Sequence, residues 1–341
     1  MPGLPQARLS RRTLILSAAV TPLCAPFIAK AAPAPFVYKF ATGQDPTHPV
    51  NIRLKEAFDR IRDKTGGALD IRLFPANQLG TETDVMSQVR LGSLEFLLLS
   101  ASIYATLVPV AGIANTAYAF NDYAAVWKAM DGNLGNYVRA QTEKVGLIAA
   151  GKIWDNGFRQ VTSSTRDIKT PEDLKGFKIR VPPAPMLTSF FSAMGASPTP
   201  MNFAEVYSAL QTKVIDGQEN GLSLIATTRL YEVQKFCSLT GHSWDGYWPL
   251  ANRKAWEKLP EAMRATALEE LDRSALDQRA DLAAKDASLR TFLTEKGLAV
   301  RDVDKAAFRQ VLIGTSYYKD WKAKYGDEAW GELETACGKL T

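Results

Sequence analysis

An arginine near the end of a short apolar segment is the residue of this sequence best placed to bind an anion. Residues 174–183 read LKGFKIRVPP. In an extended strand, Ile179 and Val181 share one face and Arg180 points to the other. Pro182 ends the strand because it lacks an N–H, so Arg180 lies near the carboxyl end, where open α/β sheets bind ligands. Its guanidinium group could bind a carboxylate through two hydrogen bonds, although a surface arginine on an edge strand has the same pattern.

The sequence gives little support for catalysis. It has no nucleophile elbow, no phosphate-binding loop, no dinucleotide fingerprint after the first strand and no HExxH motif. His48 and His242 are the only histidines, and neither lies beside an evident nucleophile, so we interpret both as structural or cleft-lining residues. Asp216 and Glu219 lack the ligand spacing of an EF-hand loop. We therefore expect no metal, no cofactor and no enzymatic activity.

Composition favours a globular protein of two domains. The chain has 341 residues, 46% of them hydrophobic and 23% charged, which is too long for one small core and too apolar for a disordered chain. The net charge of +5 is concentrated at the start, because residues 1–31 carry four basic and no acidic residues and the remainder carries 37 basic and 36 acidic ones. The resulting balance of +1 predicts no nucleic-acid partner, since binding to phosphates requires a concentrated positive surface.

The basic start belongs to a predicted export signal. Residues 1–31 combine positive charge, an apolar stretch and an Ala-Lys-Ala exit. Residues 10–16, SRRTLIL, resemble a twin-arginine signal, with the general secretory route as the alternative. Two prolines interrupt the apolar stretch and disfavour a membrane anchor, while Leu23 before Cys24 disfavours a lipid anchor. We predict cleavage after Ala31 and a periplasmic protein.

Cysteine content gives a second indication of the class. Three cysteines and two histidines argue against a zinc finger or an iron–sulfur cluster. Cleavage of the signal would leave only Cys237 and Cys337. An oxidising compartment permits a disulfide between them, and the alternative, two buried free thiols, stays open.

Strands and helices alternate in the N-terminal part. The spacing of apolar residues predicts strands over residues 36–42, 69–74 and 94–99 and helices over residues 50–64 and 81–91. Thr81 is the expected N-cap of the second helix, and Gly92 the residue near its end. This alternation predicts an α/β lobe with a mainly parallel sheet.

A second block of the same kind predicts a second lobe. Its expected extended segments are residues 147–154, 158–163 and 177–181, and its expected helices are residues 171–174, 186–194 and 203–213. Further along, Pro260 and Gly297 enclose 36 residues without glycine or proline. An unbroken helix of that length would extend roughly 54 Å, so we expect it to span both lobes, with a kink near residues 283–284 as the alternative.

Several motifs in this order resemble the extracytoplasmic solute-binding proteins of TRAP transporters, of the DctP type. The resemblance rests on the segment around Arg180 and on residues 154–160 (WDNGFRQ), 195–207 (GASPTPMNFAEVY), 216–220 (DGQEN), 231–236 (YEVQKF) and 256–260 (WEKLP). It covers essentially all of the chain after the export signal. The fold it implies is periplasmic-binding-protein-like, with two α/β lobes, a hinge and a long helix spanning both.

The resemblance also implies a set of ligand-binding residues. Arg180 matches the arginine that forms a salt bridge with the substrate carboxylate, and Arg159 a second arginine that supports the same group. Asn220 matches an asparagine that hydrogen-bonds the carboxylate, and Phe203 an aromatic wall. Ser100 and Ser102 fall where family members place variable polar contacts.

Aromatic residues mark a departure from the family pattern. Residues 242–248 read HSWDGYW, and Trp154 adds a further large ring. Rings in a closing cleft can cover the apolar part of a ligand, so Trp154, Trp244 and Tyr247 are candidate ligand contacts, Trp244 first among the rings of the segment. The alternative is that Trp244, Tyr247 and Trp248 pack between the lobes. This segment favours a bulky monocarboxylate, either aromatic or non-aromatic.

These observations predict a monomeric receptor that binds a small organic acid by lobe closure and delivers it to integral-membrane TRAP transporter subunits. We expect an N-terminal lobe formed by residues 32–156 and about 246–283, a C-terminal lobe formed by residues 157–245 and about 284–341, and a ligand cleft between them. A receptor of the same fold that feeds a periplasmic sensor is the alternative, and a secreted enzyme on this scaffold is the least favoured interpretation.

Overall fold

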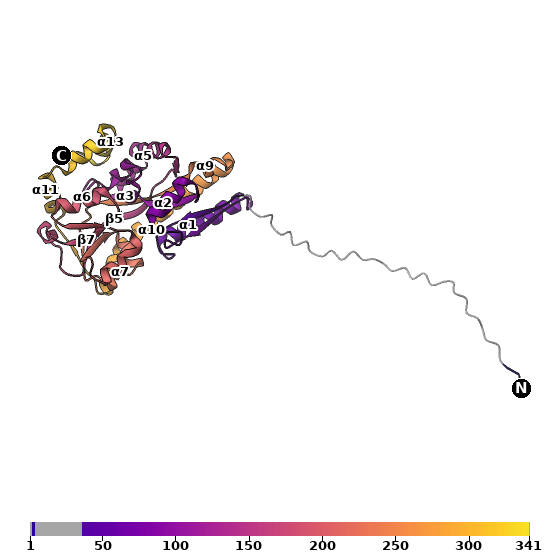
Figure 1. Cartoon of the computed structure of the whole chain (residues 1–341), viewed down its shortest axis with the longest axis horizontal. Helices are drawn as coiled ribbons and strands as arrows, with labels where there is room; N and C mark the ends of the chain where they lie inside the picture. The colour runs from indigo at the N-terminus through magenta and orange to yellow at the C-terminus, as the bar shows by residue number, and fades with distance from the viewer. Residues whose placement is uncertain (1, 4–35, 341) are drawn as a thin grey trace. The chain divides into compact units, whose positions relative to one another are not determined.

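The computed structural model describes residues 2–3 and 36–340. Apart from residues 2–3, the predicted export signal and its cleavage site lie outside the described residues. Within the described part of the chain, strands and helices form two six-stranded mixed sheets with helices packed around them. The two sheets occupy different parts of the folded unit (Figure 1), as expected for two α/β lobes.

The first sheet contains the predicted N-terminal strands and one long strand from much later in the chain. Its strands are β1 (Phe36–Ala41), β2 (Leu69–Phe74), β3 (Phe96–Ser100), β4 (Leu147–Ala149), β5 (Trp154–Phe158) and β11 (Trp244–Asn252). The order is β2-β1-β3-β11-β4, and β5 also pairs with β11. Strand β1 is parallel to β2 and β3, whereas β11 is antiparallel to β3, β4 and β5. The predicted parallel arrangement therefore holds only for the first three strands.

The second sheet confirms that the middle of the chain builds its own α/β layer. Its strands are β6 (Gln160–Ser163), β7 (Lys178–Val181), β8 (Ser197–Pro200), β9 (Gly217–Asn220), β10 (Phe236–Leu239) and β12 (Ala299–Asp302). The order is β12-β10-β6-β9-β7-β8. Strand β7 is parallel to both of its neighbours, β8 and β9, which places the carboxyl end of β7, with Arg180, beside the end of β9.

Strand β11 is the longest of the strands that the sequence pattern did not predict, which also include β8, β9, β10 and β12. All nine of its residues are buried, so it shows no polar–apolar alternation, and Pro249 breaks the usual strand composition. The proline is tolerated here, and its carbonyl accepts a hydrogen bond from the Ala150 N–H at 3.0 Å. At Gly246 the register shifts, and a Cβ there would lie 2.4 Å from the Trp244 ring. Only glycine fits this position.

Among the described residues, the helices that the sequence predicted lie close to their predicted positions, whereas those within residues 101–144, 222–227, 253–257 and 305–337 had no prediction. The α-helices are α1 (Pro49–Lys64), α2 (Glu82–Leu91), α3 (Ala101–Tyr104), α4 (Tyr123–Met130), α5 (Asn133–Lys144), α6 (Pro185–Ala193), α7 (Val206–Gln211), α8 (Leu222–Thr227), α9 (Arg253–Glu257), α10 (Glu261–Glu295), α11 (Lys305–Ile313), α12 (Tyr317–Tyr325) and α13 (Asp327–Cys337). Four 3₁₀ turns accompany them, η1 (Pro109–Asn115), η2 (Pro171–Leu174), η3 (Phe203–Glu205) and η4 (Leu230–Glu232). Helix α2 has the predicted ends, with a capping box at Thr81 and Gly92 in the left-handed region at φ +83°.

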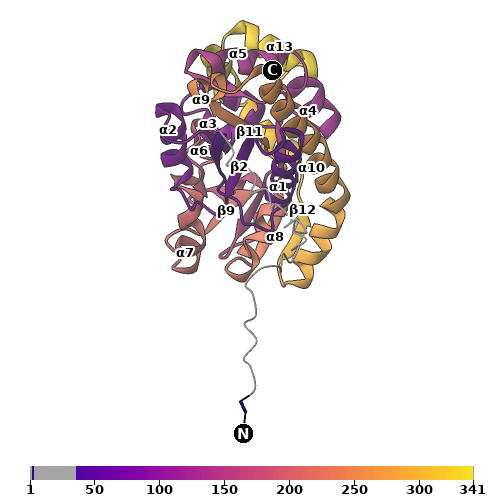
Figure 2. The same ribbon diagram turned by 90° about the vertical axis from the view of Figure 1, so that its right-hand side faces the viewer.

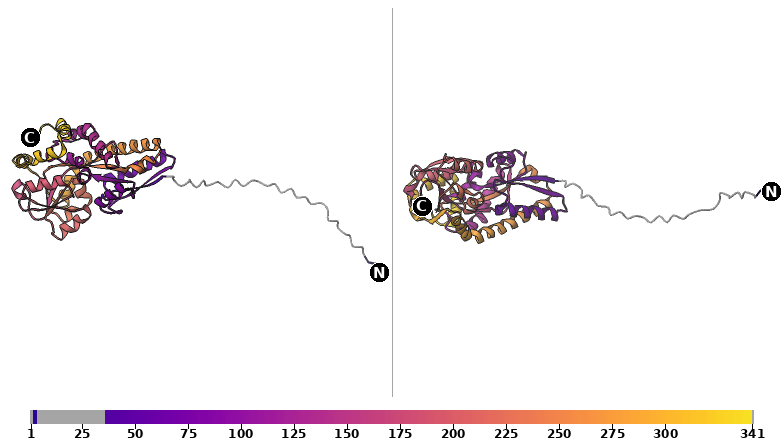
Figure 3. Two further views of the ribbon diagram at one scale, coloured as in Figure 1. Left: turned by 45° about the horizontal axis from the view of Figure 1, so that its top comes forward. Right: turned by 90° about the horizontal axis from the view of Figure 1, so that it is seen from below.

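The long helix is continuous and contacts both sheet layers. Helix α10 runs for 35 residues without the alternative kink dividing it. It packs on α1 and β5 of the first sheet and on α8 and β12 of the second. Arg53 on α1 pairs with Asp281 on α10 at 2.8 Å, and Arg290 on α10 pairs with Asp302 on β12 at the same distance. Figure 2 shows α10 along one side of the folded unit toward β12, and Figure 3 shows it beside the N-terminal elements in purple.

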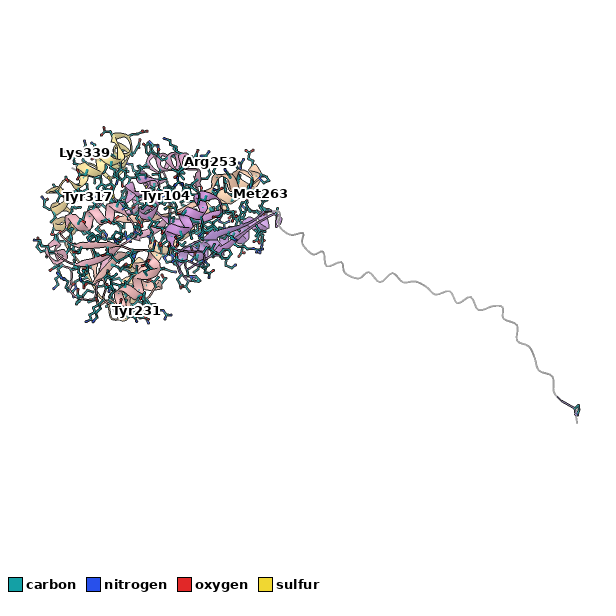
Figure 4. The ribbon with its side chains drawn as sticks, in the orientation of Figure 1. Tyr104, Tyr231, Arg253, Met263, Tyr317 and Lys339 are labelled. Atoms are coloured by element: carbon teal, nitrogen blue, oxygen red, sulfur yellow. The ribbon has the colours of Figure 1, made fainter. Side chains whose placement is uncertain are left out.

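The C-terminal helix bears on where one lobe ends and the other begins. Helix α13 packs against α4, α5 and η1, with Trp330 and Leu333 buried. Figure 4 places Lys339, just beyond α13, on the opposite side of the folded unit from Tyr231 of η4. This packing favours assigning residues 327–337 to the first lobe, in place of the predicted assignment to the second.

Both remaining cysteines are free thiols in the structure, Cys237 buried and Cys337 half-buried, so the disulfide alternative is not realised. Burial raises the pKa of the Cys237 thiol to about 12, which makes it a poor nucleophile at neutral pH. In the part of the chain that the structure describes, no helix has both the length and the apolar character needed to cross a membrane.

Candidate functional site

One small cavity between the two sheets collects most of the predicted ligand-binding residues. Its volume is about 20 Å³, roughly the space that one water molecule needs. The predicted residues that line it are Ser100, Arg159, Arg180, Phe203, Asn220 and Tyr247, and the remaining lining residues are Gln44, Glu82, Ile103, Asn156, Pro182 and Leu224. Both sheets contribute, because β3 and β11 carry Ser100 and Tyr247 and β7 and β9 carry Arg180 and Asn220.

Strand ends explain why these residues meet. Ser100 is the last residue of β3, Asn220 the last of β9, and Arg180 the next to last of β7. Gln44 follows β1 by a few residues. Polar side chains at the carboxyl ends of strands are the usual ligand contacts of open α/β sheets, and here the ends from two sheets meet at one cavity.

Arg180 is held firmly, but no acidic side chain pairs with it. Its side chain is almost fully buried, with 1% exposed. Its Nε and Nη2 groups donate to the Met201 carbonyl oxygen at 2.9 and 2.6 Å, and its guanidinium carbon lies 5.6 Å from the centre of the Phe203 ring. Among the described residues it forms no ion pair within 4 Å. The guanidinium group therefore has N–H donors left and a charge that no direct ion pair with a described residue neutralises.

The pKa of Arg180 is consistent with the lack of a directly paired acidic side chain. Burial lowers the pKa of Arg180 to about 10, against the opposing attraction of Glu82 and Glu219. The group is still cationic at neutral pH, but the lowered pKa shows that its charged form is held in an unfavourable environment. An anion bound at this position would remove that penalty.

Arg159, in contrast, is already neutralised. It lies between β5 and β6, where the chain passes from one sheet to the other. Its Nε and Nη2 groups bind both carboxylate oxygens of Glu219, its Nη1 donates to Asp245 Oδ2 at 3.0 Å, and its Nη2 donates to Asn220 Oδ1 at 3.0 Å. Burial alone would lower the pKa of Arg159, but Glu219 and Asp245 hold it above its ordinary value.

This difference changes the role expected for the second arginine. A guanidinium group has five N–H donors, and the hydrogen bonds of Arg159 to the described residues leave one of them, on Nη1, without an acceptor. Arg159 can offer a ligand that single N–H, and its main contribution is to fix Asn220 and Asp245 in place. Arg180 is the group that can bind a carboxylate with its full charge.

Neutral polar groups complete the wall of the cavity. Tyr247 donates its hydroxyl to Asn156 Oδ1 at 2.7 Å, and Asn156 Nδ2 donates to Asp245 Oδ2 at 3.2 Å. The Ser100 hydroxyl accepts from the Ile103 N–H at 3.4 Å and lies 2.6 Å from the Ser102 hydroxyl. These bonds fix the orientation of groups that could hydrogen-bond a small polar ligand.

Three predicted contacts do not lie on the cavity wall. Trp244 packs edge-on against Phe120 and Trp127 and donates its indole N–H to Asp155 at 2.8 Å. Trp154 is fully buried in the core formed by α1, α10 and the first sheet. Ser102 is separated from the cavity by Ser100, and its hydroxyl donates to Asp245 Oδ2 at 3.1 Å. Both tryptophans therefore pack in the core, and Tyr247 and Phe203 are the predicted rings that line the cavity.

The two histidines have structural contacts. His48 caps α1 by accepting from the Val50 N–H at 3.2 Å, and its Nε2 lies 3.4 Å from Ser223 Oγ. Burial lowers its pKa to about 4. His242 is fully buried between Thr240 and Glu219, at 2.8 and 3.1 Å, and stacks on Phe190. Asp216 accepts from the Lys178 N–H, whereas Glu219 pairs with Arg159. The two carboxylates therefore have separate partners and form no carboxylate pair.

Sequence reasoning did not single out Gln44, Glu82 or Asn156. Gln44 follows a predicted strand by the rule used for Arg180, so this rule could have found it. Asn156 lies inside the motif at residues 154–160, two residues after Trp154, which was the predicted contact in that motif. Glu82 had no signal of its own, because an acidic residue in the first turn of a helix is explained by the helix dipole alone.

Asp155 predicts a pH dependence of stability. Burial raises its pKa to about 7, despite hydrogen bonds from Trp244 and the Gly157 N–H. Between about pH 4 and pH 7 the folded state keeps this proton and the unfolded state loses it, so the free energy of unfolding falls as pH rises. In urea unfolding at pH 5 and pH 7.5, Asp155→Asn should gain stability over wild type at the higher pH, on the order of 2 kcal/mol. Equal differences at both pH values, as expected for the exposed control Asp63→Asn, would contradict this.

Two α/β lobes that enclose a small polar cavity at the ends of their strands define a two-lobed ligand-binding protein. The chain belongs to the bacterial extracellular solute-binding protein family 7 (DctP), whose model matches residues 40–323. It is 33% identical over 275 residues to the 2,3-diketo-L-gulonate-binding periplasmic protein YiaO of Escherichia coli (strain K12), covering 80% of this chain and 84% of that protein.

Solved structures show the same two-lobed fold. A TRAP periplasmic solute-binding protein from Sulfurospirillum deleyianum DSM 6946, with bound succinate, matches with a TM-score of 0.84 and 27% identity, over 89% of this chain and 99% of that one. The sugar acid binding protein DctPAm from Advenella mimigardefordensis strain DPN7T, in complex with galactonate, matches with a TM-score of 0.85 and 26% identity, over 91% and 100%. These relatives are binding proteins, which supports binding rather than catalysis for this chain.

Proposed function

We propose that this protein is the periplasmic receptor of a TRAP transporter, and that it captures a small organic acid between its lobes for delivery to separate membrane subunits. The observation that carries the proposal is the buried Arg180 guanidinium, which lines the cavity and has no acidic partner within 4 Å among the described residues. A ligand carboxylate would supply the missing negative charge and accept its free N–H donors.

Binding starts from the carboxylate. One ligand oxygen would accept from Arg180, and a second could accept the remaining N–H of Arg159, which lines the same cavity. Asn220 stays oriented by its bonds to Arg159 and to Gln218 Oε1, the latter at 2.7 Å. Because these donors are already fixed, ordering them costs little when the ligand binds.

Lobe closure follows from how the cavity is built. Its walls come from both sheets, so a ligand can touch all of them only when the lobes are together, and binding shifts the population to the closed state. Direct contacts between the lobes support the same state. The Phe203 N–H donates to Glu82 Oε2 at 3.3 Å, and the Thr83 hydroxyl donates to Asn202 Oδ1 at 3.4 Å.

The relatives support an acid as the ligand, since their names and structures refer to 2,3-diketo-L-gulonate, succinate and galactonate. The sequence prediction was a bulky monocarboxylate, aromatic or not, and the core position of Trp244 removes the ring of residues 242–248 on which it mainly rested. We propose a compact organic acid instead. We keep the twin-arginine signal over residues 1–31, cleavage after Ala31, periplasmic location and a monomeric state as parts of the proposal.

Thermal unfolding with a panel of small carboxylic acids tests this function. A ligand that binds only the folded state raises the melting temperature as its concentration exceeds Kd. At least one carboxylate should raise it, and amides or alcohols of the same carbon skeleton should not. If no carboxylate shifts the melting temperature, and mass spectrometry of the native protein finds no acid already bound, the proposed function is wrong.

A further inference from the structure

Glu82 is the one acidic side chain on the wall of the cavity. We propose that Glu82 accepts hydrogen bonds from hydroxyl groups of the ligand and excludes a second carboxylate, so that the ligand is a hydroxylated monocarboxylic acid. This proposal rests on the proposed function and narrows it to one chemical class of acid.

Contacts with three neighbours, Thr81, Phe203 and Gly43, determine where the Glu82 side chain lies. Glu82 is the first residue of α2, directly after the capping residue Thr81. Its Oε2 accepts from the Phe203 N–H of the opposite lobe. Its Cγ and Oε1 lie 3.3 and 3.1 Å from where a Cβ on Gly43 would stand, so a larger residue at position 43 would push the carboxylate away. Glycine at this position lets the carboxylate occupy its place on the wall.

Charge balance argues against a dicarboxylic ligand. The charge of Arg159 is neutralised by Glu219 and Asp245. Two charges on the wall therefore lack a partner within 4 Å among the described residues, the cation of Arg180 and the anion of Glu82. One ligand carboxylate neutralises Arg180. A second carboxylate would find no free cation on the wall and would meet the like charge of Glu82 in a partly desolvated site, where repulsion is strong.

Hydrogen-bonding capacity argues for hydroxyl groups. A carboxylate can accept about four hydrogen bonds, whereas Glu82 accepts from one other residue in the described part of the chain, through the Phe203 N–H. Burial raises the pKa of Glu82, although Arg180 and the Phe203 N–H act to lower it, so a further donor would stabilise the ionised form. A ligand hydroxyl provides that donor and can also accept from Gln44, Ser100 or Asn156 on the same wall. A ligand ammonium group would satisfy Glu82 but could accept nothing from these neighbours.

The test compares matched acids on the full-length mature protein by isothermal titration calorimetry. The probes are lactate, erythronate and galactonate, their deoxy counterparts propionate, butyrate and hexanoate, the dicarboxylate succinate, and the amino acid 4-aminobutanoate. Wild type should bind one hydroxy acid at least 100-fold more tightly than its deoxy counterpart, succinate and 4-aminobutanoate. Glu82→Gln should weaken that hydroxy acid about 10-fold or more and reduce discrimination against succinate by a similar factor. The exposed control Glu328→Gln should change neither.

A second variant separates the two parts of the proposal. Glu82→Asp keeps the charge but shortens the side chain, so it should weaken the hydroxy acid and still exclude succinate. Equal binding of hydroxy and deoxy acids by wild type, preference for succinate or 4-aminobutanoate, or an unchanged succinate ratio in folded Glu82→Gln would overturn the inference and leave the proposed function standing. If no acid in any panel binds wild type, the proposed function fails and the inference fails with it.

Discussion

Replacing Arg180 with methionine is expected to abolish ligand binding while the ligand-free protein stays as stable as wild type. Loss of one partner of a buried, hydrogen-bonded charge pair costs about 2–5 kcal/mol of binding, which is about 30- to 5,000-fold in Kd. In the absence of ligand, the same substitution removes a desolvated cation with no acidic partner and two hydrogen bonds to the Met201 carbonyl. These two changes oppose each other, so the free energy of unfolding should stay within about 1 kcal/mol of wild type.

The measurement pairs calorimetric titration of the best carboxylate with urea unfolding of the ligand-free protein. Arg180→Lys should also bind poorly, because an ammonium group cannot reproduce the two-pronged geometry of a guanidinium group. Arg273→Met, on the exposed face of α10, is the control for the loss of one positive charge and should bind as wild type does. Unchanged affinity in Arg180→Met would show that the ligand carboxylate binds elsewhere.

The equivalent substitution at Arg159 should have the opposite result, with a large loss of stability. Methionine at this position would leave Glu219 and Asp245 buried without their cation, and breaking a buried pair in this way costs about 3–5 kcal/mol. The Asn220 side chain would also lose one partner. We expect the urea midpoint to fall strongly, with binding lost as a consequence of the disordered site.

The stabilities of Arg159→Met and Arg180→Met can be compared directly to test this prediction. They make the same substitution of buried residues that line the same cavity, so they differ mainly in whether acidic partners are left behind. The double variant Arg159→Met with Glu219→Gln should recover part of the lost stability, because one of the orphaned charges is removed. A variant Arg159→Met as stable as Arg180→Met would mean that the ion pairs of Arg159 contribute nothing to folding.

The periodic parts of the fold could be predicted from the sequence, and so could the position of Arg180 at the end of its strand. Helices α1 and α2 and strands β1 and β2 follow from spacing and caps, because each has one apolar face and a clear end. Helix α10 follows from the absence of glycine and proline over its length. Arg180 follows from strand alternation and the proline after it, and the structure places it on the cavity wall.

The rest depends on tertiary contacts that have no local signal. Strand β11 is buried on both faces, so nothing in its pattern distinguishes ligand-facing rings from core rings, and only its pairing shows that Tyr247 faces the cavity and Trp244 does not. The sequence likewise does not show that the two arginines, Arg180 and Arg159, differ in their acidic partners. Their difference comes from Glu219 and Asp245, which lie 60 and 86 residues away from Arg159.

The order of strands in the first sheet also constrains how the protein is made. Strand β11 lies between β3 and β4, yet it follows them by roughly a hundred residues or more, and α13, which covers α4 and α5, comes at the end of the chain. A nascent chain that has emerged from the ribosome only to residue 240 therefore exposes the apolar edge of β3 and has nothing to fill it. Such non-local pairing is slow and prone to aggregation, so this lobe should acquire its structure after translation, and chaperones that hold unfolded chains should raise its yield.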